Sequence, residues 1–314
     1  MAKKKLRKAA AAVMHDIGDT GVALPLRSSG LNRHPDAPLP RPYVFDREQV
    51  RHVSIGLKLD LNIALTGPTG CGKTMLPTML AAAIGQPMIR FNCNGETRVS
   101  SMVGIDRPAV HDGVLTLRFS ERALVKAMRE GYWVLFDEID AALPSVLMVL
   151  QPVMEEDNRR LYVPELEEEV RGHEHFRVFA TGNTIGYRSL ARAQHAGTNP
   201  LNDAFLDRFG MVIACDYPDK DTETQRIKVN VPGCHALVAE AISRVAAELR
   251  SDDKFKSDFS TRRCVQWARL TTELGGPAHI YEAVELAVLR KLRNPTDASV
   301  CREVMQRVLG GEGK

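Results

Sequence analysis

Apolar residues between positions 43 and 217 follow two patterns that alternate along the chain. Short continuous apolar runs, bounded by polar residues and glycine, are typical of strands buried on both faces. The longer stretches between them repeat apolar residues at three- and four-residue spacing, which is typical of helices. This alternation predicts an α/β fold with a parallel sheet covered by helices. The predicted strands are "NIALT" (62–66), "MIRFNC" (88–93), "YWVLFDE" (132–138), "FRVFAT" (176–181) and "GMVIACDY" (210–217).

The pattern changes at both ends of this region. After Pro218 no strand is predicted, and five stretches with helical spacing indicate a small all-helical domain over 218–314. Residues 1–42 begin with a basic run and carry five prolines between 22 and 42, which is typical of an extended, flexible arm. Such an arm offers little apolar surface for packing, so we expect it to be dispensable for activity. The predicted domains are therefore 1–42, 43–217 and 218–314.

Two segments within the sheet region are predicted to form β-hairpins. "GIDRPAVHDGVLTLRFSE" has a turn pattern at His111-Asp112-Gly113 and interrupts a predicted helix. "DNRRLYVPELEEEVRGHEHF" precedes the strand at 176–181. The second hairpin is rich in acid, with Glu165, Glu167, Glu168 and Glu169, and such a surface repels a phosphate backbone.

The stretch "GPTGCGKT" directly follows the first predicted strand. Its pattern, Gly67-x-x-x-x-Gly72-Lys73-Thr74, is the phosphate-binding loop of P-loop NTPases. Glycine lets the backbone turn tightly enough for its N–H groups to face phosphate oxygens, and a helix starting near Gly72 adds its positive end. We expect Lys73 at the β- and γ-phosphates and Thr74 on Mg²⁺. An ordinary glycine-rich turn is the alternative, and the flanking strand and helix argue against it. The predicted ATP-binding residues are Gly67, Pro68, Thr69, Gly70, Cys71, Gly72, Lys73 and Thr74.

Acidic residues end the third predicted strand, in "YWVLFDEID". Ligands of open α/β sheets bind at the carboxyl edge of the strands. Asp137 is therefore expected to bind the nucleotide site's Mg²⁺ through its water shell, and Glu138 to polarise the attacking water. The alternative, an ordinary helix N-cap after a strand, is disfavoured by the phosphate loop upstream.

Three further polar residues are candidates for the reaction. Asn183, at the end of "FRVFATGN", is placed to hold the attacking water. Arg208 lies just before the last strand and should point away from its own nucleotide, so we expect it to act on a neighbouring subunit's nucleotide as an arginine finger. Arg262, in "FSTRRC", is a candidate to reach over the phosphates from the helical domain, with Arg263 beside it as the alternative.

Composition narrows the classes of function. No apolar run approaches the ~20 residues that cross a bilayer, so we expect no membrane partner. The six cysteines occur singly, without a Cys-x-x-Cys pair, which favours reduced thiols and a cytoplasmic protein. Outside the five basic residues at positions 3–8, the chain holds 37 basic and 39 acidic residues. This balance makes a nucleic-acid partner an unfavoured alternative.

The motifs together resemble the AAA+ ATPases. The phosphate loop, "LFDEID", "FATGNT", "FLDRFG" and "STRR" occur in the order of that family. The surrounding sequence is similar to the MoxR clade, and within it to the small ATPase subunits of aerobic cobaltochelatases, with CbbQ and NorQ ATPases close behind. "RPYVFDREQV", "ETRVSSMVGIDRPAV" and "GTNPLNDAFLDRF" carry the chelatase-like similarity.

The resemblance implies a hexameric ring that hydrolyses ATP with Mg²⁺ to remodel a protein. It implies a partner with a von Willebrand factor A domain and a client enzyme, with insertion of a metal into a tetrapyrrole as the chelatase case. In this clade the two hairpins line the ring's pore and engage clients. A nucleic-acid motor and a scaffold that does not hydrolyse ATP are the alternative functions. The complete set of Lys73, Asp137, Glu138, Asn183 and Arg208 argues against the scaffold.

Overall fold

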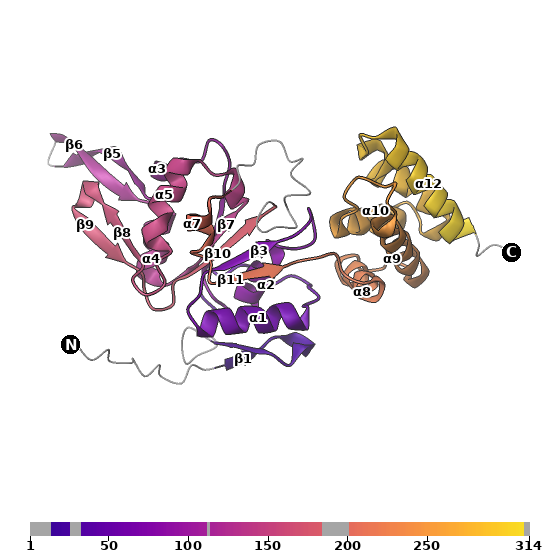
Figure 1. The fold of residues 1–314 in the computed structure, drawn as a ribbon, viewed down its shortest axis with the longest axis horizontal. Coiled ribbons are helices and arrows are strands. Elements are labelled where there is room, and N and C mark those ends of the chain that lie inside the picture. The colour runs from indigo at the N-terminus through magenta and orange to yellow at the C-terminus, as the bar shows by residue number, and fades with distance from the viewer. Residues whose placement is uncertain (1–13, 26–32, 112–113, 184–200, 311–314) are drawn as a thin grey trace. The chain divides into compact units, whose positions relative to one another are not determined.

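The computed structural model describes residues 14–25, 33–111, 114–183 and 201–310, which fall into two compact units (Figure 1). The first unit holds the chain up to Pro40, Phe45–Thr66 and Thr74–Ala214. The second holds Arg41–Val44, Gly67–Lys73 and Cys215–Lys314. The division at Ala214 lies close to the boundary expected after residue 217. The phosphate loop, however, groups with the helical unit, which the linear pattern does not indicate.

Five parallel strands form the sheet of the first unit. All five predicted strands are present, in the order β11–β3–β10–β7–β4. Their bounds are β3 Ile63–Thr66, β4 Met88–Asn92, β7 Trp133–Asp137, β10 Arg177–Gly182 and β11 Met211–Ala214. Thr66 pairs in register with Gly182, and Asn92 with Asp137, so the carboxyl ends of these strands share one edge. This edge is where the sequence places the acidic residues.

Apolar side chains hold the helices of the first unit against the sheet. The main helices are α1 Arg47–Lys58, α2 Met75–Ala83, α4 Ala123–Glu130 and α5 Pro144–Val153. Every residue of β7 is buried, as expected for a strand covered on both faces. Phe136 of this strand packs with Leu124 of α4 and Leu150 of α5 in one core. The αβα architecture predicted from the sequence is therefore confirmed.

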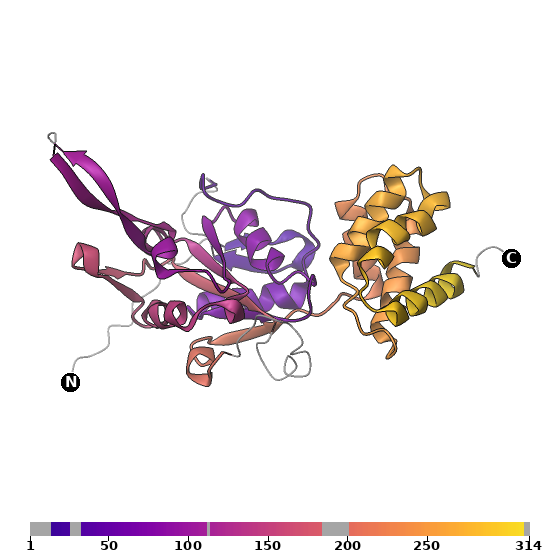
Figure 2. The same cartoon turned by 90° about the horizontal axis from the view of Figure 1, so that it is seen from above.

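Both predicted hairpins are present. The first joins β5 Gly104–His111 to β6 Val114–Glu121, between the short helix α3 Val99–Met102 and α4. It projects from the rest of the first unit (Figure 2). The second pairs β8 Arg160–Val163 with β9 Glu168–Arg171. Of the predicted turn at 111–113, residues 112 and 113 lie outside the described part of the chain.

The expectation of a flexible arm over 1–42 is wrong for part of that segment. β1 Met14–Asp16 pairs with β2 Ala23–Pro25, and the side chains of Ile17 and Leu24 are fully buried. The Ser54 hydroxyl on α1 donates to the carbonyl of Ala23 at 2.8 Å. Residues 33–40 are also placed: Asp36 accepts from Lys126 and Tyr132, each at 2.7 Å. Composition missed these contacts because the apolar residues at 22–26 are few and lie in a proline-rich segment without helical or strand periodicity.

The second unit is a helical bundle, as predicted. Its helices are α8 Lys220–Asn230, α9 Ala236–Ser251, α10 Thr261–Glu273, α11 Ile280–Ala287 and α12 Pro295–Leu309. Trp267 lies fully buried at its core and donates its ring N–H to the carbonyl of Ile280 at 2.9 Å. In the described part of the chain, no helix has the length and apolar character needed to cross a membrane.

Candidate functional site

The phosphate loop adopts a backbone that needs glycine. Gly67, Gly70 and Gly72 have φ values of 148°, 71° and 116°, in the region that side chains disfavour. A Cβ at Gly67 would lie 2.0 Å from the carbonyl oxygen of Cys215, and one at Gly70 would lie 2.7 Å from the Cβ of Ser260. Neighbouring backbone and side chains therefore exclude larger residues. Regular helix begins after the loop, at Met75 rather than near Gly72.

Lys73 holds its ammonium within this loop. The side chain is largely buried, and Nζ donates to the carbonyls of Gly67 and Pro68 at 2.8 and 3.0 Å. A cation folded under the loop matches the charge of a polyphosphate. Burial raises the pKa of the neighbouring Cys71 thiol, so the loop's cysteine stays uncharged beside an anion site.

Arg262 is the arginine of "STRR" that lies beside the loop. Ser260 caps α10 by accepting from the backbone N–H of Arg263, which places the first turn of this helix at Gly70. The Cβ of Arg262 lies 3.7 Å from the position of a Cβ on Gly70, and its side chain is exposed. Arg263 instead has its charge near the buried thiol of Cys301. Of the two arginines, Arg262 is therefore the one that lies beside the phosphate loop.

Asp137, at the carboxyl edge of the sheet, accepts hydrogen bonds from several side chains. Its Oδ1 accepts from the hydroxyl of Thr74 at 2.7 Å and from that of Thr181 at 2.5 Å. Its Oδ2 forms an ion pair with Arg90 of β4. The structure thus brings together Thr74 and Asp137, the two residues predicted to hold Mg²⁺.

The residues after Asp137 are held in defined positions. Glu138 has φ 57° and ψ 47°, a left-handed conformation that is uncommon for residues other than glycine. Its backbone N–H donates to the Thr181 hydroxyl at 3.0 Å, while its side chain is exposed. Such strain is typical of functional positions. The buried Asp140 accepts from the backbone N–H of Asn183 at 2.9 Å, which fixes Asn183 beside the acidic segment.

Negative charge concentrates at this edge. The buried thiol of Cys93 has its pKa raised to about 12, first by burial and then by Asp137, Asp140 and Glu138. A cation is therefore favoured there. Among the described residues, no group of three or more His, Cys, Asp or Glu is arranged to hold a metal alone. One carboxylate and one hydroxyl suit Mg²⁺, which keeps several waters and takes its remaining ligands from phosphates.

Arg208 lies at the opposite edge of the sheet. It follows α7 Asp203–Leu206 and precedes β11, and its guanidinium pairs with Glu155 at 3.1 Å. Its carbonyl accepts from the side chain of Asn62, the residue immediately before β3, at 2.8 Å. Arg208 is thus fixed at the amino ends of these strands, whereas Asp137 stands at the carboxyl end of β7.

Comparison with known proteins decides the family. The sequence profile of the AAA domain of the dynein-related subfamily matches residues 62–209. The chain is 30% identical to the aerobic cobaltochelatase subunit CobS of a Sinorhizobium species, over 94% of this chain and 89% of that protein. The chain belongs to the MoxR-like AAA+ ATPases. It is therefore an enzyme that binds and hydrolyses ATP.

Other AAA+ proteins share parts of this chain. Midasin of Dictyostelium discoideum is 37% identical over 161 residues, which are 51% of this chain but 2% of midasin. The RuvB Holliday junction branch migration motor of Thermotoga maritima shares the fold, with a TM-score of 0.50 and 13% identity over 85% of this chain and 82% of RuvB. Both likenesses support the AAA+ fold.

Three residues of this ATPase's site were missed by sequence reasoning: Arg90, Asp140 and Thr181. Thr181 stands two residues before Asn183 in "FATGN", and Asp140 ends "DEID", so both lie inside quoted motifs. Arg90 gives a weaker signal, a charged residue inside the apolar run "MIRFNC". Only the strand register shows what it contacts.

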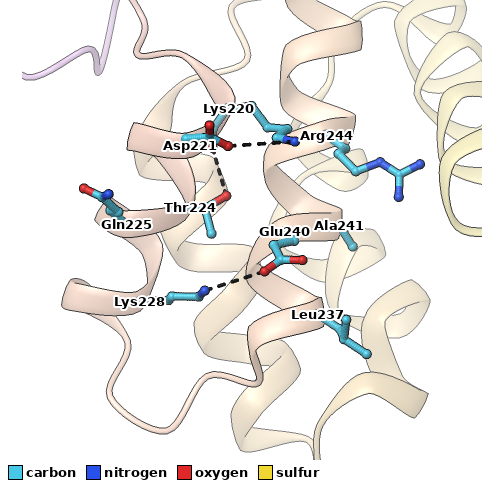
Figure 3. Close-up of a pocket in the computed structure, with 9 residues that line it drawn as sticks. All are labelled: Lys220, Asp221, Thr224, Gln225, Lys228, Leu237, Glu240, Ala241 and Arg244. Atoms are coloured by element: carbon cyan, nitrogen blue, oxygen red, sulfur yellow. Dashed lines mark hydrogen bonds and ion pairs between the residues drawn. The ribbon is translucent and has the colours of Figure 1, made fainter.

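A separate shallow pocket lies between α8 and α9 in the second unit (Figure 3). Lys228 faces Glu240 at 3.7 Å, and Lys220 lies 3.8 Å from Asp221, so acidic and basic groups alternate along its lining. This mixture favours neither a phosphate nor a metal ion. The pocket therefore lacks the cationic lining that a triphosphate requires.

Proposed function

We propose that this ATPase assembles into a ring and uses ATP hydrolysis to remodel a protein partner. The observation that carries the protein-remodelling part is the exposed apolar face of the β5–β6 hairpin. The arrangement of the nucleotide site is the argument for hydrolysis, and the position of Arg208 is the argument for a ring.

In the proposed site, the loop residues 67–74 hold the triphosphate, with Lys73 at its outer phosphates. Thr74 and Asp137 hold Mg²⁺, which when bound offsets charge on the phosphate oxygens. Glu138 accepts a proton from the attacking water, and Asn183 orients that water. Arg262 approaches from the first turn of α10.

Arg208 completes the site of the neighbouring subunit in this proposal. Arg208 lies at the amino ends of the strands, away from its own Asp137. Its side chain is 26% exposed, so a group on another chain can contact the guanidinium. An arginine supplied in trans stabilises the charge that develops on the transferred phosphoryl group. This is the reason for expecting a ring, with six subunits as in related AAA+ ATPases.

The β5–β6 hairpin has one apolar face. Residues directly opposite each other on paired strands share a face, and here Pro108 pairs with Leu117 and Val110 with Leu115. Val110, Leu115 and Leu117 are each 72% exposed. Exposed apolar surface of this kind is typical of a protein contact site. Nucleic acid would instead require basic groups on this face.

The relationship to CobS supports a proposal for the partner. A von Willebrand factor A-domain protein is the proposed direct partner, and an enzyme that requires maturation, such as a metal chelatase, is the proposed client. A nucleic-acid motor remains the competing function, because RuvB shares the fold. DNA-stimulated hydrolysis would favour that alternative.

Nucleotide binding and hydrolysis test the site roles. Lys73→Ala should abolish ATP binding, and Glu138→Gln should retain binding but lose turnover. Arg208→Ala should bind ATP normally and hydrolyse it about 10³-fold more slowly. Mixing Arg208→Ala with Lys73→Ala subunits should restore part of the activity, since one interface then joins an intact loop to an intact finger. Mixed rings detected by native mass spectrometry without any recovered activity would contradict the role of Arg208.

A matched pair of hairpin variants tests the remodelling function. Leu117→Glu changes the apolar face, and Thr116→Glu places the same charge on the opposite face of the same strand. With a von Willebrand factor A-domain protein encoded beside this one, Leu117→Glu should lose partner-stimulated hydrolysis and keep the basal rate. Thr116→Glu should keep both. Equal stimulation of the two variants, or stimulation by DNA alone, would contradict the proposal.

A further inference from the structure

Arg90 is the cation that pairs with Asp137 in the first unit. Arg90 lies on β4, the edge strand of the sheet, and is in register with Leu135, two residues before Asp137. Side chains two residues apart on a strand point to the same face, so the guanidinium extends along the sheet toward the Asp137 carboxylate. It reaches Oδ2, while the two threonine hydroxyls occupy Oδ1.

The two partners of this ion pair differ in exposure. The Asp137 side chain is 6% exposed, whereas that of Arg90 is 55% exposed. The carboxylate is therefore a buried group held by two hydroxyls, whereas water already solvates about half of the arginine side chain. Half of the Arg90 side chain already lies in water, so little hydration changes when it moves, and the buried carboxylate that it leaves needs another cation in its place.

The charge around Asp137 explains why a cation is needed there. Glu138 follows directly, and Asp137, Asp140 and Glu138 all raise the pKa of the same Cys93 thiol, so their negative charges act on one place. Without a positive charge, these charges at the sheet edge would be unbalanced. Arg90 supplies one positive charge, and a divalent ion at the same place supplies two.

We propose that Arg90 is a place-holder for Mg²⁺ at Asp137. It neutralises the carboxylate in the absence of the metal and is pushed aside, toward solvent, when Mg²⁺ arrives with the nucleotide. Arg90 and Mg²⁺ then compete for the same carboxylate. The arginine thus keeps the empty site ordered and sets the Mg²⁺ concentration at which it fills. This inference rests on the proposed magnesium site at Thr74 and Asp137.

The test is a Mg²⁺ titration of nucleotide binding with the full-length chain. Binding of a fluorescent ADP analogue is measured at graded free Mg²⁺, starting from excess EDTA, for wild type, Arg90→Met and Arg90→Lys. Methionine removes the charge and keeps much of the length, and lysine keeps the charge. The half-saturating Mg²⁺ concentration should fall about fivefold in Arg90→Met, the size expected for one half-exposed charge, and should stay within about twofold in Arg90→Lys.

The direction of the shift separates this role from a purely orienting one. If Arg90 only oriented Asp137, its loss would raise the half-saturating Mg²⁺ concentration, and that result, or no change, would overturn the proposal. In an Asp137→Asn background, Arg90→Met should cause no further shift, and a shift there would also overturn it. Wild-type binding that is independent of Mg²⁺ would refute the magnesium site itself. Unchanged circular dichroism and thermal unfolding of metal-free Arg90→Met would show that the shift does not arise from misfolding.

Discussion

Replacing Asn62 with leucine should strongly destabilise the first unit. Asn62 is fully buried at the start of β3, where its side-chain amide donates to the carbonyls of Met154 and Arg208 at 2.7 and 2.8 Å. Its Oδ1 accepts from the guanidinium of Arg159 at 2.9 Å. One side chain thus joins the end of α5, the residue before β8 and the segment that carries the proposed arginine finger. Leucine has the same branched skeleton of four heavy side-chain atoms but makes none of these bonds, and its two methyl groups take more room than the amide.

The magnitude follows from the groups left without partners. Asn62→Leu removes the donors of two carbonyls and one acceptor of Arg159, at a site that water does not reach. Each unsatisfied buried group costs about 1–3 kcal/mol, although Arg159 keeps its bond to the carbonyl of Asp60. The apolar side chain returns about 1–2 kcal/mol through burial. We expect a net loss of about 3–5 kcal/mol in the free energy of unfolding, a large share of the ~5–15 kcal/mol typical of a domain.

Urea unfolding followed by tryptophan fluorescence measures this loss. The chain has two tryptophans, Trp133 in the sheet of the first unit and Trp267 in the second. A Trp267→Phe background leaves Trp133 as the reporter for the unit that contains Asn62. With a urea slope of about 2 kcal/mol per M, the midpoint should fall by about 1.5–2.5 M.

Asn158→Leu is the matched control, because this exposed asparagine lies in the same α5–β8 connection. It should change the free energy of unfolding by less than about 0.5 kcal/mol. If Asn62→Leu lost less than about 1 kcal/mol, or no more than the control, the three bonds would not hold these segments together as argued.

Three further predictions concern other parts of the chain. Deleting residues 2–30 should lower stability by roughly 3–6 kcal/mol in urea unfolding, because the buried Ile17 and Leu24 are lost, whereas deleting 2–12 should be nearly neutral; equal effects would refute the packing role. Asp140→Ala should slow steady-state hydrolysis about 10–100-fold with little change in ATP affinity, and Asp140→Asn should restore part of the rate; an unchanged rate would contradict its hold on Asn183. Of six thiols, Cys234 alone should react with a disulfide reagent in the native protein at about pH 8, because the other five are buried; burial raises the pKa of all six, so access decides the difference, and a second fast thiol would contradict this.

The sequence predicts the sheet well because its strands are buried on both faces. The run "WVLF" in β7 contains no polar residue, which is typical of a strand buried on both faces. It can therefore be assigned as a strand without knowing which strands lie beside it. The phosphate loop is equally local, since Gly67 and Gly70 are required by the backbone of their own segment. Because the strands and the loop could be assigned, Asp137 and Thr74 could also be placed at the carboxyl edge of the sheet.

Contacts that depend on strand order were not predictable in the same way. Arg90 meets Asp137 only because β4 lies beside β7 in a register that pairs Asn92 with Asp137. No spacing along the chain encodes this neighbour. The β1–β2 pair was missed for a related reason. β2 packs against α1, and this contact is not visible in the spacing of apolar residues along the chain.

The parallel sheet also explains why the proposed finger needs a second subunit. The Asn62 side chain fixes the carbonyl of Arg208 just before β3, and the phosphate loop begins just after it. The four residues of β3 separate these points by about 13 Å at ~3.3 Å per residue, more than an arginine side chain spans. Glu155 holds the guanidinium at the same edge. On the proposed role, an arginine in this position would meet a nucleotide only on another chain, so hydrolysis should rise more steeply than linearly with protein concentration. A rate per subunit that is constant from dilute, monomeric protein upward would show that Arg208 takes no part in the reaction.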